Sequence, residues 1–269
     1  MPDHPEPPDR PAHPPPREAV QRWRLVLARR VLEGDTGQRE QLAAWDRALL
    51  ASGLPLGGLD AVPPRARFAS AAPLSASMPG EAELADIWLT ERVPAWRVRE
   101  ALAASVPAGY VLREIHDVWL GAPPLPGQVV ASVYRATFTP HESVSDATVE
   151  PAALAAACAA MLAASAIPRE RPKGQTTIAY DLRPFVDALV VDAAGRTLRM
   201  TLRHDPERGI GRPEEVLAEL GERLGRPLAP ATLAREGLVL APPPVLTPAA
   251  PRPRGRPRPP GTSPGRPRR

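Results

Sequence analysis

The chain has 269 residues, 43% of them hydrophobic, which is enough to build a core in one large or two small domains. Its single cysteine, Cys158, excludes an internal disulfide framework and any metal or iron–sulfur site made of several cysteines. The formal net charge of +4 comes from one end, because residues 251–269 hold seven arginines and no acidic residue, which leaves 27 basic and 30 acidic side chains in residues 1–250. The body is therefore mildly acidic, and attraction to nucleic acid is expected first in the tail.

Both ends of the chain are rich in proline. Residues 1–20 contain no apolar run that would form the core of a signal peptide. The longest apolar stretch, residues 151–167, is mostly alanine and lies at the lower limit for a membrane span. Residues 242–269 contain too much proline and arginine for a packed core, which predicts a solvated tail with polyproline II character. We therefore predict disordered segments at 1–20 and 242–269 in a soluble, cytoplasmic protein with no membrane partner.

The first half of the body predicts the element order β-α-β-β-α-β. The expected elements are a strand at 22–32, a helix from Asp35 to Gly53, extended pieces at 67–71 and 85–90, a helix from Pro94 that stops before Pro107, and a strand at 110–120. Asp35 and Gln38 have the spacing of a capping box, and Pro94 suits the first position of a helix.

The second half of the body repeats this order. The expected elements are a strand at 128–139, a helix from Pro151, one long or one broken strand at 178–191, a turn at 192–195, a strand at 198–202, a helix from Pro213 to Gly225, and a short strand at 238–240. In such a split unit, two helices cover one face of a four-stranded antiparallel sheet. We predict the α+β class, with two consecutive ferredoxin-like units at 21–125 and 126–241.

Short sequence landmarks follow one another in a characteristic order over residues 21–240. They include Asp46-Arg47-Ala48-Leu49 ahead of Gly53-Leu54-Pro55, then Arg67-Phe68-Ala69, Asp181-Leu182-Arg183-Pro184 and Arg212-Pro213-Glu214-Glu215-Val216-Leu217. In this order the chain resembles the radical-SAM-linked proteins of domain-of-unknown-function family 2344, whose members occur alone or fused behind a B12-binding radical SAM enzyme. The family usually begins its first helix with Ser-His-Leu-Asp, where this chain has residues 37–40 as Gly-Gln-Arg-Glu.

No catalytic, cofactor-binding or metal-binding constellation stands out, so we expect a protein that is not itself an enzyme and carries no cofactor. A radical SAM enzyme needs three closely spaced cysteines for its cluster, which makes this chain at most the companion of a separate enzyme. Asp181 and Arg183 are predicted to project from one side of a strand, where they form a surface ion pair or bind a ligand carboxylate or phosphate. Asp46 and Arg47, which lie in a landmark of the family, are further candidates for a ligand or partner contact.

The remaining candidate side chains favour structural roles. Cys158 lies on the apolar stripe of its predicted helix, which predicts a buried core thiol. His116 and His204 lie near strands without a recognisable catalytic partner in the sequence, so we expect ordinary histidines. The tryptophans Trp88, Trp96 and Trp119 are expected in the core rather than stacked against RNA bases.

Two functional classes stay open. The first is an accessory protein that presents a sheet face, or the cleft between its halves, to a radical SAM enzyme or its substrate. The second is an RNA-associated binding protein with a basic tail that adds salt-dependent affinity. The tail residues that would make this contact are Arg252, Arg254, Arg256 and Arg258. An independent enzyme is the least favoured class, and the sequence leaves the oligomeric state open.

Overall fold

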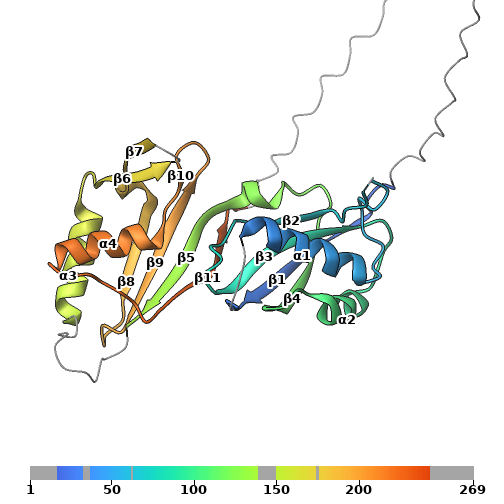
Figure 1. Ribbon diagram of the computed structural model, residues 1–269, viewed down its shortest axis with the longest axis horizontal. Helices are drawn as coiled ribbons and strands as arrows, with labels where there is room; N and C mark the ends of the chain where they lie inside the picture. The colour runs from blue at the N-terminus through green and yellow to red at the C-terminus, as the bar shows by residue number, and fades with distance from the viewer. Residues whose placement is uncertain (1–16, 33–36, 62, 139–149, 174–175, 243–269) are drawn as a thin grey trace, which may run out of the picture.

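The computed structural model describes residues 17–32, 37–61, 63–138, 150–173 and 176–242. Of the segments predicted to be disordered, 1–20 and 242–269, all but residues 17–20 and 242 lie outside the described residues. Within 17–20, the Val20 backbone N–H donates to the Leu89 carbonyl at 2.8 Å, so the ordered chain begins earlier than predicted. Within the described ranges the fold is mixed α+β, with four α-helices and a largely antiparallel sheet. Figure 1 shows two lobes side by side, which we call the N-terminal and C-terminal halves. In the described part of the chain, no helix combines the length and the apolar character needed to cross a bilayer.

Among its described residues, the N-terminal half consists of four strands and two helices. They are β1 (Gln21–Arg29), α1 (Gln38–Ala51), β2 (Phe68–Ser70), β3 (Gly80–Leu89), α2 (Ala95–Ser105) and β4 (Tyr110–Val118). The strands lie in the order β4-β1-β3-β2, and each neighbouring pair is antiparallel. Both helices cover one face, because Trp45 of α1 and Leu102 of α2 belong to the same core cluster as Leu25 of β1.

The helix starts of this half differ slightly from those predicted. Gly37, and not Asp35, is the N-cap of α1, and no side chain caps the helix. Pro94 is the N-cap of α2 rather than its first helical residue. The predicted end of α1 is confirmed, because Ser52 caps the helix and Gly53 follows with a φ of 67°, a conformation that glycine adopts without strain. Local capping patterns thus placed these helix boundaries within a few residues.

The C-terminal half contains seven strands, two α-helices and two short 3-10 helices in the described residues. They are η1 (Leu125–Gln128), β5 (Val129–Thr137), α3 (Pro151–Ala163), β6 (Pro168–Lys173), β7 (Thr176–Asp181), η2 (Arg183–Phe185), β8 (Val186–Val191), β9 (Thr197–Asp205), β10 (Gly209–Ile210), α4 (Pro213–Arg223) and β11 (Thr232–Leu240). β5 lies between β9 and β11, and β9 also pairs with β8 and β10. Leu154 of α3 and Leu220 of α4 share a core cluster with Met200 of β9, so both helices cover the same face of this half as well.

The β6–β7 hairpin is an element that the sequence did not predict. Residues 178–191 were expected as one long or one broken strand, and the second alternative is confirmed, because β7 ends at Asp181 and η2 separates it from β8. β6 and β7 form a two-stranded sheet of their own. Arg169 of β6 binds the carboxylates of Glu219 and Glu222 on α4, which fastens the hairpin to that helix. These tertiary ion pairs stabilise a strand whose own sequence, Pro-Arg-Glu-Arg-Pro-Lys, has low strand propensity.

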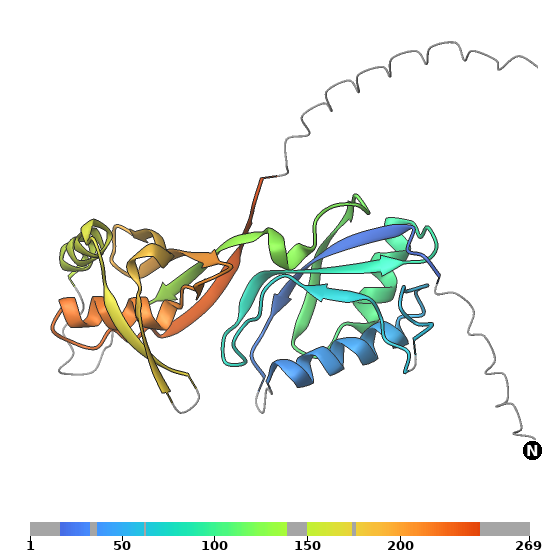
Figure 2. The ribbon, with the colours of Figure 1, turned by 90° about the horizontal axis from the view of Figure 1, so that it is seen from above.

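One nine-stranded sheet runs through both halves. Its main path is β10-β9-β5-β11-β3-β1-β4, and β11 meets β3 in parallel at the pair Arg235 and Gly80. β11 covers residues 232–240, well beyond the short strand predicted at 238–240. Figures 1 and 2 show β5 and β11 at the seam between the lobes. Met78, from the loop before β3, packs into the core cluster of the C-terminal half, so the two halves share their packing as well as their sheet.

Candidate functional site

A cleft of about 710 Å³ lies where the loop between β2 and β3 faces the start of α4. We call residues 71–79 the β2–β3 loop. The cleft is lined by Pro73, Leu74, Ser75 and Met78 of this loop, by Tyr134 and Arg171, and by residues 209–215. Sites for small molecules in proteins usually measure about 300–1,000 Å³. The cleft therefore has the size of a small-molecule site, and it draws its walls from both halves of the protein.

The β2–β3 loop is held in place by two buried arginines. Arg29 of β1 is 3% exposed and Arg235 of β11 is 1% exposed. Both guanidiniums donate hydrogen bonds to carbonyl oxygens of the loop. The distances are 2.8, 2.9 and 3.3 Å from Arg29 to Ser75, Ala76 and Met78, and 3.1 and 3.0 Å from Arg235 to Ala72 and Pro73. Five charge-assisted bonds hold a segment with almost no regular structure, so this wall of the cleft is preformed.

Arg235 also forms a buried ion pair that joins the two halves. Its Nε donates to Glu83 Oε1 of β3 at 2.9 Å, and its Nη2 donates to Glu83 Oε2. Burial by itself would lower the pKa of Arg235, but the carboxylate of Glu83 and the nearby Tyr134 raise it above its ordinary value. Arg235 therefore stays charged, and its charge is compensated inside the protein by a residue 152 positions away in the sequence.

A serine–histidine contact joins two neighbouring strands of the C-terminal half, β5 and β9. Ser132 Oγ of β5 is 2.8 Å from His204 Nε2 of β9. Burial, and then the charge of Arg235, lower the pKa of His204 from 6.5 to about 4, so the ring is neutral at pH 7. Ser132 has no exposed surface, which means that this contact satisfies buried polar atoms and does not present a nucleophile. The sequence did not predict this contact, because its partners lie 72 residues apart and meet only through the pairing of β5 with β9.

Two arginines place positive charge in the cleft. Arg171 of β6 is half-buried, and its guanidinium carbon lies 5.0 Å from the centre of the Tyr180 ring. Arg212 is the exposed N-cap residue of α4, and no side chain caps this helix. Neither arginine forms an ion pair with a carboxylate in the described ranges. Nearby, Tyr180 Oη and Glu215 Oε2 are buried without a well-formed hydrogen bond among the described residues, and burial together with Glu215 raises the pKa of Tyr180.

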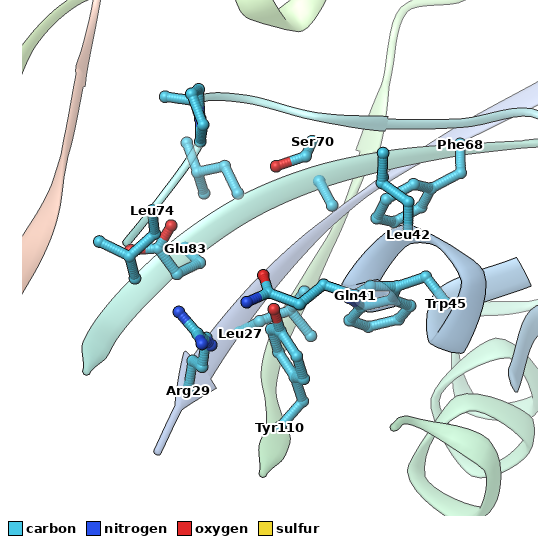
Figure 3. Close-up of a pocket in the computed structure, with 14 residues that line it drawn as sticks. Leu27, Arg29, Gln41, Leu42, Trp45, Phe68, Ser70, Leu74, Glu83 and Tyr110 are labelled. Atoms are coloured by element: carbon cyan, nitrogen blue, oxygen red, sulfur yellow. The ribbon is translucent and has the colours of Figure 1, made fainter. Parts of the chain in front are cut away.

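A second, smaller cavity lies on the other side of the β2–β3 loop. Figure 3 shows Arg29, Glu83 and Leu74 at one end of it and Trp45 and Phe68 at the other. The rings of Trp45 and Phe68 are stacked with their centres 5.1 Å apart. The cavity measures about 50 Å³, which is room for water but not for an organic ligand. The inter-half cleft is thus the better candidate for a ligand site.

The residues predicted as a ligand site, Asp181 and Arg183, are used for local structure. Arg183 lies in η2 and not on the strand of Asp181, so the two side chains do not project together from one strand as expected. Asp181 Oδ1 accepts hydrogen bonds from the backbone of Ile167 at 2.7 Å and of Arg183 at 2.9 Å. The Arg183 guanidinium donates to the carbonyls of Leu162 and Val186. These bonds fix the turn between β7 and β8, away from the residues that line the cleft.

The other predicted contact residues are spread over the molecule. Asp46 of α1 accepts a hydrogen bond from Arg65 at 3.1 Å, and Arg47 is exposed on the same helix. Both lie apart from the cleft lining. The tail arginines Arg252, Arg254, Arg256 and Arg258 lie outside the described residues. No group of three or more His, Cys, Asp or Glu side chains that could hold a metal ion occurs in the part of the chain that the structure describes.

Two further expectations about single residues have clear outcomes. Cys158 is buried as predicted, and burial raises the pKa of its thiol to about 11. The prediction of three core tryptophans is wrong for two of them: Trp88 is 7% exposed, but Trp96 and Trp119 are 67% and 73% exposed. Trp96 lies in the first turn of α2, outside the buried positions Val98 and Leu102 of that helix, and Trp119 lies directly after β4, where the sheet no longer directs side chains into the core.

The fold and the cleft define a two-lobed α+β protein with a preformed cleft of small-molecule size between its halves. The model of the family described as "Uncharacterized protein conserved in bacteria (DUF2344)" matches residues 36–213. Because this match spans about two thirds of the sequence, the chain belongs to this family. The resemblance seen in the landmark residues is thereby confirmed at the level of the family. No curated protein matches the chain.

Proposed function

We propose that the protein is a non-catalytic accessory protein that works with a separate radical SAM enzyme and recognises that enzyme or its substrate through the inter-half cleft. The observation that carries this proposal is the preformed β2–β3 loop. Arg29 and Arg235 fix this loop by hydrogen bonds, and it lines the cleft together with the start of α4. A preformed wall lowers the entropic cost of binding, which favours recognition. The radical SAM partner is proposed from the sequence landmarks and from the single cysteine, which cannot hold a cluster in this chain.

A binding role agrees with the chemistry of the buried groups. Catalysis needs an acid, a base or a nucleophile that reaches the substrate. Ser132 and Cys158 are both buried, and the raised thiol pKa keeps Cys158 protonated near neutral pH. These groups support a structural role, and the polar side chains that line the cleft, a serine, a tyrosine, two arginines and two glutamates, are suited to holding a ligand.

We further propose that each half is a ferredoxin-like unit. In the N-terminal half, the strand order β4-β1-β3-β2 supports this assignment, and in the C-terminal half the order β11-β5-β9-β8 repeats it. Each half places its two helices on one face of the sheet. The β6–β7 hairpin and β10 would then be additions to the second unit, and both contribute residues to the cleft. The cleft would thus arise where the added elements meet the first unit.

Co-purification tests the accessory role. The tagged full-length protein is recovered from its native host under anaerobic conditions, and the polypeptides bound to it are identified by mass spectrometry against a tag-only control. We expect enrichment of a polypeptide that carries a radical SAM cluster motif. The variant Arg212→Glu, which reverses a charge in the cleft, should reduce the enrichment, whereas Arg196→Glu, at an exposed arginine outside the cleft lining, should not. If no radical SAM polypeptide is enriched with the unmodified protein, the accessory role is wrong.

The charge of the tail favours RNA binding as a second candidate function. Seven arginines without an acidic residue in residues 251–269 form a cation that would bind a phosphate backbone in a salt-dependent way. Binding of a structured RNA is compared for the full-length chain and a chain that ends at Pro244, over a series of salt concentrations. This function predicts tighter binding by the full-length chain and a decline with salt. Equal binding by both chains, or binding that does not weaken with salt, would contradict it.

A further inference from the structure

Arg171 is directed to the cleft by its surroundings. Its ring contact with Tyr180 orients the guanidinium along the hairpin, and Arg169, two residues earlier, is already neutralised by Glu219 and Glu222. A methyl group placed on Gly209 would lie 3.6 Å from Arg171 Nη2, so the guanidinium rests against the bare backbone of β10. A half-buried guanidinium with no carboxylate within ion-pair distance among the described residues has donors left over for a ligand.

Arg212 adds a second charge three residues beyond Gly209. Gly211 precedes it, and a side chain there would meet Phe185 and Leu202 at 3.0 and 3.1 Å, so this position must stay small. Pro213 follows, and its ring fixes the backbone at the first position of α4. The segment that carries Arg212 is therefore rigid. The positive end of the α4 dipole points to the same place and adds to the attraction for an anion.

Apart from the arginines, the glutamates and Ser75, the lining of the cleft is largely apolar. Leu74 and Met78 come from the β2–β3 loop, and Tyr134 and Ile210 come from the C-terminal half. Met78 and Tyr134 are each 5% exposed, so they form a firm floor rather than mobile surface side chains. A ligand that used this cleft would place an apolar body against these side chains and a polar group toward Arg171 and Arg212.

The two glutamates at the start of α4 do not cancel this preference. Glu214 is exposed to solvent, where water and salt screen its charge. Glu215 sits beside Tyr180, where its Oε2 is buried and where it helps to raise the pKa of that phenol. Both glutamates line the cleft, but neither forms an ion pair with Arg171 or Arg212 in the described part of the chain.

We infer that the inter-half cleft binds a small organic anion, with a carboxylate or phosphate group received by Arg171 and Arg212 and an apolar body packed on Leu74, Met78 and Tyr134. Arginine suits both oxyanions, since its planar donors match carboxylate and phosphate alike. The inference deepens the proposed function and rests on it, because it names the class of substrate or ligand that the accessory protein would recognise.

Calorimetric titration of the purified full-length protein tests the inference with three aromatic probes. Phenyl phosphate and benzoate carry the two anionic groups, and benzyl alcohol is the neutral control. We expect saturable binding of at least one anion and about tenfold weaker binding, or none, by Arg171→Gln and Arg212→Gln, because each substitution removes charge-assisted hydrogen bonds. Preference for phenyl phosphate over benzoate assigns the natural ligand to phosphates, and the reverse assigns it to carboxylates.

Arg196→Gln is the matched control, because Arg196 is an exposed arginine in the turn between β8 and β9 and does not line the cleft. Anions that bind only to the basic tail would bind the Arg171→Gln/Arg212→Gln double variant as tightly as the unmodified protein. That result would overturn the inference, as would no saturable binding or equal binding of benzyl alcohol. The titration uses the protein alone, so a missing enzyme partner in co-purification leaves it intact, and a failed titration leaves the co-purification result standing.

Discussion

Replacing Arg235 by methionine removes a charged side chain that connects β11, the β2–β3 loop and β3. Methionine keeps much of the volume and removes the guanidinium. The variant leaves Glu83, which is 8% exposed, without its ion-pair partner. It also removes the donors to the carbonyls of Ala72 and Pro73. All three losses fall at the seam between the halves.

The expected cost is large compared with that of a surface ion pair. Removing one member of a buried pair costs about 3–5 kcal/mol, because the remaining charge is left uncompensated. The Arg203–Asp187 pair, whose side chains are 61% and 42% exposed, is the matched control. The variant Arg203→Met should cost less than about 1 kcal/mol. We expect Arg235→Met to lower the free energy of unfolding by about 4 kcal/mol and the melting temperature by about 10 °C.

Two optical probes separate the halves in one denaturation experiment. All five tryptophans lie between Trp23 and Trp119, so tryptophan fluorescence reports on the N-terminal half, whereas far-ultraviolet circular dichroism reports on both halves. In the unmodified protein, the shared sheet predicts coincident urea transitions by the two probes. In Arg235→Met the seam is weakened, so the two midpoints should separate. The double variant Glu83→Leu/Arg235→Met should recover most of the loss, because no buried charge then remains.

The reasoning fails if Arg235→Met is no less stable than Arg203→Met and keeps coincident transitions. Such a result would mean that the β11–β3 contact and the packing of Met78 hold the halves together without the ion pair. A further loss of stability in the double variant, relative to Arg235→Met, would contradict the assignment of the cost to an uncompensated Glu83.

Three other predictions concern single residues. The pKa of His204 is about 4 in the folded protein and 6.5 in the unfolded chain, so the folded state binds fewer protons. The protein therefore loses about 2 kcal/mol of stability as the pH falls from about 6.5 to 4. Urea unfolding of His204→Gln should show a weaker pH dependence than that of His116→Gln, whose histidine is exposed. The thiol of Cys158, with a pKa of about 11, should react with iodoacetamide at pH 8 only after unfolding, and labelling of the native protein at the rate of a free thiol would contradict this. Gly58→Ala should cost at least about 2 kcal/mol, because φ is +88° and the new Cβ would lie 2.5 Å from the Arg65 carbonyl oxygen. Gly53→Ala, whose new Cβ would have nothing within 4 Å, should cost about 1 kcal/mol. Thermal melts that rank the two variants the other way would refute this prediction.

The sequence predicted those elements that depend on local signals. The start of α4 at Pro213 is confirmed, because proline at the first helical position and two glutamates in the first turn are signals read within one turn of helix. The alternation of apolar residues likewise located β5 and β9. The family resemblance also follows from short local landmarks. In these segments the neighbouring residues determine the backbone conformation, so the sequence of a single chain is enough to predict the secondary structure.

Other features depend on partners far away in the chain. The charged hairpin strand β6 is held by Glu219 and Glu222, and its own residues give no strand signal. Asp181 and Arg183 have the spacing of a pair on one strand, but the strand ends at Asp181 and Arg183 lies in η2. Both side chains form hydrogen bonds with backbone groups. The cleft residue Arg171 had no distinguishing feature in a sequence with 34 lysines and arginines.

The sequence by itself determined the class of fold, most helix ends, the burial of Cys158 and the family. Only the tertiary structure decided that a single sheet unites both halves, that Arg235 finds Glu83 across 152 residues, and that a cleft opens beside α4. The physical reason is one of range. Helix caps and apolar periodicity act over a few residues, whereas strand pairing, buried ion pairs and the walls of a cleft depend on which distant segments the completed fold brings together.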